Sequence, residues 1–396
     1  MTNTIGLIVF VASGIGLLSQ VSSVQAQDAT SIFQVVQTPN PDRFLFNDLF
    51  AISGSSPTDI WAVGYAAIHY DGTSWTGFPV PGVGNTGDKL WGVATISPTN
   101  AWAVGSFRTS STTTGNLQHW DGTKWSIAQG SPDDVGEILG SIAAISADDI
   151  WVGSCIPSDF EHFDGTQWTF FYAGGTGSPV GESCIQSISA ISTNDVWAAG
   201  WINYSGNTSS TQVQHWDGTQ WTSMTTPNVG TGSNQLFGIV ALADNNVWAV
   251  GDSVAPDTGI EYPNRTLIEH WDGTSWTVVP SPNFDYGDVP RDNVLQGIVA
   301  VAANNLWAFG YIEANPSAGS WNELSLVQHW DGTSWSHVSS PNPNPSGDPS
   351  LLNDPLYAGF FTSGSLWLVG SEATNLADLP YGPADGTLVL LHTTGQ

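Results

Sequence analysis

Histidine and aspartate, two residue types that often do acid–base chemistry, recur in this sequence at fixed places of a repeat. Seven of the eight His share one register: His69, His119, His162, His215, His270, His329 and His392. In the first six repeats an Asp follows two residues later, in a DGT segment: Asp71, Asp121, Asp164, Asp217, Asp272 and Asp331. A catalytic side chain is normally single, whereas a residue that recurs in every repeat supports packing or a turn. We therefore expect these residues to be structural, with each Asp carboxylate accepting N–H groups of its turn.

Acidic residues outside the repeat register are better candidates for catalysis. Glu137, Glu182 and Asp354 each stand close to the start of a predicted strand. A glycoside hydrolase uses two such carboxylates, one of them as a general acid. A serine hydrolase would need a G-x-S-x-G elbow, which is absent. A sialidase would need three Arg that converge on a carboxylate, whereas the four Arg of this sequence lie in different parts of the chain. Enzymatic activity therefore stays open, and the sequence leans towards a binding protein.

A mixed set of aromatic and amide residues is the candidate ligand site. Counting back along the first predicted strand of each repeat gives Asn47, Trp91, Gly140, Gln186, Phe237, Gln296 and Leu356, with Tyr357 adjacent. Such side chains, unequal from repeat to repeat, are what a small-ligand or sugar pocket uses. Trp201 and Trp321 fall in expected loops, where an aromatic side chain can stack on a sugar or anchor a partner. Ordinary packing explains the same residues without a ligand, and the sequence does not choose between the two.

An internal repeat supplies the elements that position these residues. A Trp followed by small and apolar residues returns at spacings between 41 and 60, at Trp61, Trp102, Trp151, Trp197, Trp248, Trp307 and Trp367. One unit contains four strand-like runs: QLFGIVAL from Gln235, VWAVG from Val247, TLIEHW from Thr266 and SWTVVPSPN from Ser275. A period of this length with four strands per unit is the signature of propeller blades. We expect the repeated Trp to fill the space between blades.

The two ends of the chain complete the repeat between them. The seventh unit stops at LVLLHTTGQ, where His392 takes the His place and no DGTxW follows. The missing run stands at the other end, where FQVVQTPN from Phe33 matches WTVVPSPN from Trp276. An N-terminal strand would then complete the last blade and leave no open strand edge there. The sequence thus predicts an all-β fold, a closed seven-bladed β-propeller of four-stranded blades, in one domain over residues 27–396.

The N-terminus and the cysteines indicate the compartment. An apolar run from Ile5, followed by small residues at Val24 and Ala26, predicts a signal peptide over residues 1–26 and hence a secreted protein, extracellular or periplasmic. Cys155 and Cys184 are the only cysteines. An oxidising compartment favours their pairing, and their places in the repeat favour a bridge between neighbouring blades.

The charge balance excludes several partners. Six Lys and Arg against 35 Asp and Glu give a net charge of −29, so no basic patch for nucleic acid can form, and binding to anionic lipid is disfavoured. No membrane insertion and no cofactor are expected, and the chain is expected to be a monomer. Many acids fall in the variable loops on one face of the ring, but the absence of a D-x-D-x-D-G loop makes calcium there a minority alternative. The same composition favours a stability optimum at acidic pH.

The repeat resembles that of secreted seven-bladed propellers with WAVG…HWDGTxW units, over residues 32–396. Its turns are similar to those of Asp-box (BNR-like) propellers, which read S-x-D-x-G-x-T-W and are one residue longer, and its WAVG strands are similar to those of photosystem-assembly propellers. A rigid ring, variable loops and an aromatic mouth lead to the hypothesis of a lectin-like extracellular protein that binds a glycan or a surface polymer. The alternatives are a secreted glycoside hydrolase or lyase and a protein-interaction scaffold, because propellers host all three.

Overall fold

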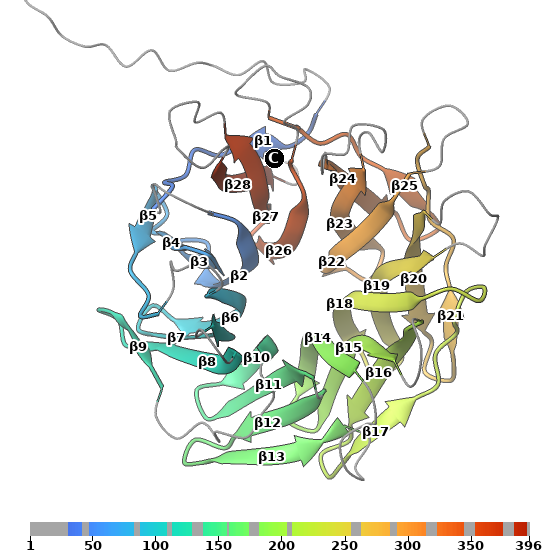
Figure 1. Ribbon diagram of the computed structural model, residues 1–396, viewed down its shortest axis with the longest axis horizontal. Coiled ribbons are helices and arrows are strands. Elements are labelled where there is room, and N and C mark those ends of the chain that lie inside the picture. The colour runs from blue at the N-terminus through green and yellow to red at the C-terminus, as the bar shows by residue number, and fades with distance from the viewer. Residues whose placement is uncertain are drawn as a thin grey trace, which may run out of the picture.

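The computed structural model describes residues 31–41, 47–82, 88–108, 113–128, 138–156, 158–173, 182–203, 208–254, 263–285, 291–313, 323–343, 353–374 and 384–393. The expected signal peptide, residues 1–26, lies outside these residues. Figure 1 shows the described strands arranged as blades around a common axis.

Seven strands form the inner wall of the ring. They are β2 (Leu49–Ser56), β6 (Lys89–Ser97), β10 (Ile138–Ser146), β14 (Glu182–Ser192), β18 (Asn234–Ala243), β22 (Asn293–Ala302) and β26 (Leu356–Thr362). Each contacts the innermost strand of the next blade, and β26 contacts β2, so the ring is closed.

The other strands follow outward in each blade. The second strands are β3 (Asp59–Gly64), β7 (Asn100–Arg108), β11 (Asp149–Cys155), β15 (Asp195–Asn203), β19 (Asn246–Val254), β23 (Asn305–Glu313) and β27 (Ser365–Thr374). The third strands are β4 (Ala67–Tyr70), β8 (Thr113–Trp120), β12 (Asp159–Phe163), β16 (Ser210–Trp216), β20 (Asn264–Trp271), β24 (Glu323–Trp330) and β28 (Ala384–Thr393). The outermost strands are β5 (Trp75–Phe78), β9 (Trp125–Ile127), β13 (Trp168–Tyr172), β17 (Trp221–Met224), β21 (Trp276–Val278), β25 (Trp335–His337) and β1 (Gln34–Val35).

The last blade is assembled from both ends of the chain, as the repeat predicted. Its strand order is β1-β28-β27-β26, and β1 pairs antiparallel with β28 through Gln34 and Leu391. Phe33 lies fully buried beside the Trp307 ring of the preceding blade, with centroids 5.8 Å apart. It occupies the place that Trp276 holds in its own blade. The predicted seven-bladed, four-stranded propeller is therefore confirmed.

The repeated Trp of the second strand is the centre of the packing between blades. Trp151 of β11 contacts Trp216 and Trp221 of the next blade, with ring centroids 4.9 and 5.2 Å away. It also stacks on His162 of its own blade at 4.2 Å, and the Nε2 of that His lies 2.8 Å from the Asp149 Oδ1 atom. This arrangement explains the repeated His as a packing residue held in place by the side chain that starts the second strand.

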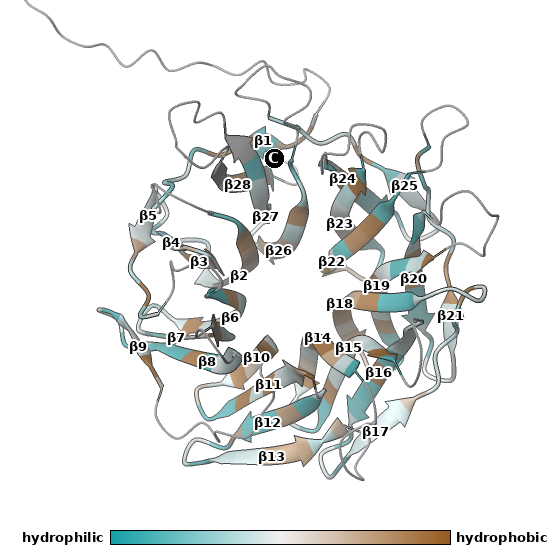
Figure 2. Cartoon of the chain, viewed as in Figure 1, coloured by the Kyte–Doolittle hydropathy of each residue, from teal (hydrophilic) through white to brown (hydrophobic). Residues whose placement is uncertain are grey.

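The same His–Asx pair recurs in five further blades: His69–Asp59, His119–Asn100, His215–Asp195, His270–Asn246 and His329–Asn305. Each of these blades thus combines a repeated Trp of the second strand with a His–Asx hydrogen bond of the same geometry. Hydrophobic segments accordingly recur along the strands of the ring in Figure 2.

His392 is the exception, and its predicted place in the repeat was wrong by one residue. In β28 it pairs with Leu366, while Leu391 pairs with Trp367. In the other blades the partner of the repeated Trp is the His, as Trp248 pairs with His270. His392 therefore takes the place of the third-strand Trp, and its ring lies 5.5 Å from that of Trp307.

The repeated DGT segment is a tight turn organised by its Asp. The Oδ1 atom of Asp121 accepts the N–H groups of Thr123 and Lys124 and the hydroxyl of Thr123. These hydrogen bonds hold the pKa of the carboxyl at about 2. Gly122 has a φ of +91°, a left-handed value that favours Gly. The structural role expected for the repeated Asp is thus present in the geometry.

The two cysteines form the expected disulfide, which joins two blades. Cys155 ends β11 and Cys184 lies near the start of β14, and the two residues also pair as strand neighbours. Their pairing fuses two four-stranded blades into one continuous sheet. A disulfide of this kind indicates an oxidising compartment.

Candidate functional site

Near the start of each innermost strand, one residue is left out of the pairing with the second strand. The register between these two strands shifts at the same place in every blade, and the skipped residues are Phe50, Trp91, Gly140, Gln186, Phe237, Gln296 and Tyr357. A β-bulge of this kind bends the strand and changes the direction of a side chain. We call these seven residues the channel ring.

The channel ring surrounds a cavity of about 180 Å³ at the axis of the propeller. The two residues that follow each ring member complete its wall, and many of them are small, such as Gly92, Gly238 and Gly297. A Cβ atom on Gly238 would lie 2.9 Å from the Cα of Gly297, so small residues let the innermost strands approach each other closely. The larger residues of the lining are those of the channel ring, the Ile or Val that stands two residues further along in six of the blades, and Phe309.

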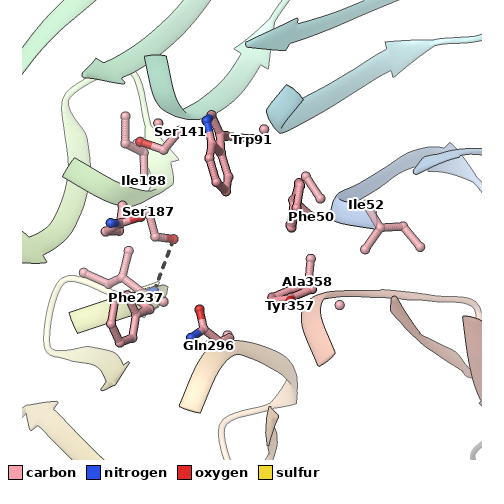
Figure 3. A pocket seen from close by; sticks show the side chains of 18 of the residues that line it. Phe50, Ile52, Trp91, Ser141, Ser187, Ile188, Phe237, Gln296, Tyr357 and Ala358 are labelled. Carbon is pink, nitrogen blue, oxygen red and sulfur yellow. Dashed lines mark hydrogen bonds between the residues drawn. The ribbon is translucent and has the colours of Figure 1, made fainter. Parts of the chain in front are cut away.

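Phe50, Trp91 and Tyr357 lie along one part of the wall, which we call the aromatic side, and Phe237 and Gln296 lie along another (Figure 3). Phe50 lies between Trp91 and Tyr357, with ring centroids 4.8 and 5.0 Å away. Gln186 and Gln296 belong to the opposite part of the wall, on either side of the blade that carries Phe237. Among the described residues that line the cavity there is no Asp or Glu. The site is thus suited to stacking and to neutral hydrogen bonding.

A lysine stands at the edge of the aromatic side. The Nζ atom of Lys89, the first residue of β6, lies 4.0 Å from the centre of the Trp91 ring. It also lies 5.4 Å from the ring centres of Phe50 and of Tyr65, which follows β3. Attraction between a cation and ring faces holds the ammonium there. Burial lowers the pKa of Lys89, and the negative charge of Asp48 opposes this shift.

Two largely buried carboxyl groups of the last blade, those of Asp354 and Glu372, do not line the cavity. Asp354, which precedes β26, is fully buried, and neither of its carboxyl oxygens has a hydrogen-bond partner. Burial raises its pKa to about 8, and the charge of Glu372 adds to the shift. Burial likewise raises the pKa of Glu372 to about 7. Burial is also the main cause that raises the pKa of Tyr357, followed by the charges of Asp48 and Glu323.

Five of the residues predicted for ligand binding meet at the cavity: Trp91, Gln186, Phe237, Gln296 and Tyr357. The count along the strand was wrong in the first blade, because Phe50 and not Asn47 belongs to the channel ring. Asn47 precedes the strand and is 2% exposed. Leu356 is also buried in the core, while its neighbour Tyr357 is the ring member.

The other candidates lie elsewhere. Trp201 was expected in a loop but belongs to β15, where it pairs with Cys184 because this strand runs on past the repeated motif. Glu182 is exposed at the start of β14, in a different blade from Asp354, and neither lines the cavity. Glu137 and Trp321 lie outside the described residues. The structure therefore does not bring Glu182 and Asp354 together as a catalytic pair.

Sequence reasoning missed Phe50, Tyr65 and Lys89. A signal for Phe50 was present, since DLFAI matches QLFGI of the fifth blade when the two are aligned on Leu and the small residue. Tyr65 and Lys89 belong to adjacent blades, and only the closed ring shows that they meet.

Within the described part of the chain, no three His, Cys, Asp or Glu side chains are grouped so that they could hold a metal ion. In that same part, no helix has the length and hydropathy needed to cross a membrane.

Known structures agree with this architecture. YCF48 bound to D1 peptide is 13% identical and covers 92% of this chain and 97% of its own, with a TM-score of 0.56. YCF48 from Cyanidioschyzon merolae is 17% identical and covers 91% of this chain and 98% of its own, with a TM-score of 0.51. The fold is that of a β-propeller. No protein-family model and no curated protein matches the sequence. The likeness to photosystem-assembly propellers therefore extends to the fold, and at this identity to the fold alone.

Proposed function

We propose that this chain is a secreted, lectin-like propeller that binds a glycan or a surface polymer at the mouth of its channel. The observation that carries the proposal is the channel ring, with Phe50, Trp91 and Tyr357 on one side and Gln186 and Gln296 on the other. Aromatic faces stack on the apolar face of a sugar, and amides hydrogen-bond to its hydroxyls. The disulfide supports a place outside the cytoplasm.

The size of the cavity limits what can enter it. About 180 Å³ is less than the volume of roughly 300–1,000 Å³ that is typical of a pocket for a complete small ligand. A single sugar ring at the end of a chain, or at a branch, fits this limit better than a whole oligosaccharide. The rest of the glycan would then lie over the loop face.

The alternatives have weaker support. A hydrolase needs two carboxylates beside the scissile bond, but the described lining of the cavity has none. A protein-interaction role has one observation in its favour, because the similar propeller YCF48 is known with a bound peptide. In such a role a single side chain of the partner would enter the cavity, so peptide binding is the second candidate.

A glycan array with the wild-type protein and Trp91→Ala tests the proposal. We expect the wild type to bind a defined set of glycans and Trp91→Ala to lose at least about tenfold in affinity, which corresponds to about 1.4 kcal/mol of lost stacking. The variant should fold, because Trp91 lines the cavity and is not one of the repeated second-strand Trp that fill the space between blades.

Tyr172→Ala is the matched control, since Tyr172 is an exposed aromatic residue on the outermost strand β13. It should bind as the wild type does. If folded wild-type protein binds no glycan, or if both variants bind equally well, the proposed site is wrong.

A further inference from the structure

The ammonium group of Lys89 is held by rings from two blades. Tyr65 and Phe50 belong to the first blade, whereas Lys89 and Trp91 belong to the second. Ring faces attract a cation, but they leave its N–H donors largely unused. Lys89 is thus fixed at the edge of the channel ring by contacts that do not satisfy its hydrogen bonding.

The other cations whose side chains the structure describes lie elsewhere. Arg265 forms an ion pair with Asp285, in which Nη1 and Oδ1 are 2.7 Å apart. Arg291 donates from Nη1 to the backbone oxygen of Glu313. Lys124 lies in a DGT turn. Among the described residues, no carboxylate forms an ion pair with Lys89 within 4 Å, and the contacts that hold its ammonium are with ring faces.

We propose that Lys89 selects a carboxylate on the ligand, so that the channel mouth recognises an acidic sugar of the uronic acid class. This inference rests on the proposed glycan-binding function and names its ligand. The sugar ring stacks on the aromatic side of the cavity, its carboxylate pairs with the Lys89 ammonium, and Gln186 and Gln296 bond to its hydroxyls. A charge-assisted hydrogen bond of this kind is stronger than a neutral one.

The acidic charge of the whole protein opposes an anionic ligand only over a short range. At physiological ionic strength the screening length is about 8 Å, so distant carboxylates contribute little. Asp48 is close enough to interact with Lys89, so its negative charge should weaken the binding of an anionic ligand. Removing the charge of Lys89 should lower the affinity for an anionic ligand, and removing the charge of Asp48 should raise it. The two variants therefore serve as controls for each other.

Isothermal titration with oligogalacturonate and with its fully methyl-esterified form tests the proposal, because esterification removes the carboxylate charge and adds only a methyl group to each sugar. We expect the wild type to bind the acid form at least about tenfold more tightly than the ester. Lys89→Gln should lose this preference and keep its affinity for the ester, whereas Asp48→Asn should strengthen binding of the acid form. Lys124→Gln, which removes a cation far from the channel, should change nothing, and Lys89→Arg should keep the preference.

Each contrary result has a distinct meaning. If the wild type binds acid and ester equally, or if Lys89→Gln weakens both alike, the role of Lys89 is overturned while glycan binding stands. If neither probe binds but the array gives neutral glycans, the acidic ligand is likewise overturned. If no glycan binds at all, the proposed function falls together with this inference.

Discussion

Replacing Phe33 with Ala is expected to lower the free energy of unfolding by about 3–5 kcal/mol, the usual cost of removing a buried aromatic side chain. Phe33 is fully buried and fills the gap between the last two blades, against the rings of Trp307 and His392. The strand that follows it, β1, is only two residues long. Phe33 is therefore the fully buried side chain that holds this segment to the ring, alongside hydrogen bonds that join Val36, Thr38 and Asn40 to Val389 and Thr387.

Ile32→Ala is the matched control for Phe33→Ala. Ile32 is adjacent in the sequence but 47% exposed, so its truncation should cost less than about 1 kcal/mol. Urea unfolding followed by circular dichroism gives both values. Equal stabilities of the two variants would mean that the ring is not closed through Phe33.

Glu269→Gln is expected to stabilise the protein at pH 8 by an amount on the order of 4 kcal/mol. Glu269 is fully buried, and neither of its carboxyl oxygens has a hydrogen-bond partner. Burial raises its pKa to about 8. Between the pKa of the unfolded chain, near 4.5, and this value, only the folded state keeps the proton, so stability falls as pH rises. Glutamine has no proton to lose, and the variant removes this part of the pH dependence.

Other blades show that Gln fits this position. Gln118 and Gln328 also precede the repeated His, and their Nε2 atoms donate to the backbone oxygens of Pro81 and Pro282. The reverse change, Gln328→Glu, should therefore introduce a new loss of stability at alkaline pH. Thermal unfolding from pH 4 to pH 9 measures both effects. Identical pH profiles for Glu269→Gln and the wild type would contradict the buried, protonated state of Glu269.

Wild-type stability should also peak at acidic pH for reasons beyond Glu269. Burial raises the pKa of Asp252 to about 7 and that of Asp354 to about 8, and each is further raised by a neighbouring carboxylate. Groups with a raised pKa stabilise the fold least in the alkaline range. The excess of acids in the composition pointed to the same optimum, but the burial of particular carboxyl groups supplies the mechanism.

The architecture could be predicted from the sequence because the repeat is nearly regular. The Trp and DGT motifs mark the strands, and the match between Phe33 and Trp276 marks the closure. His392 was misplaced because a His in the last repeat was aligned with the other His, whereas packing needed a ring in the Trp position. Register is decided by contacts between blades, and these cannot be read from a single repeat.

The site could be predicted only in part. Trp91 and Gln296 follow a regular strand pattern and were found, but Asn47 was chosen where a bulge brings Phe50 to the wall. The contact of Lys89 with Tyr65 and Phe50 joins residues of two blades. Contacts of this kind arise from the closure of the ring and leave no periodic signal in the sequence.

The most direct test of the central claim is hydroxyl-radical footprinting of the protein with and without a saturating glycan from the array. The account predicts that bound glycan protects Trp91 and Tyr357 from oxidation, while the exposed Tyr172 on β13 is oxidised equally in both samples. Unchanged oxidation of Trp91 and Tyr357 in the saturated complex, with protection on the outer strands instead, would contradict a binding site at the channel mouth.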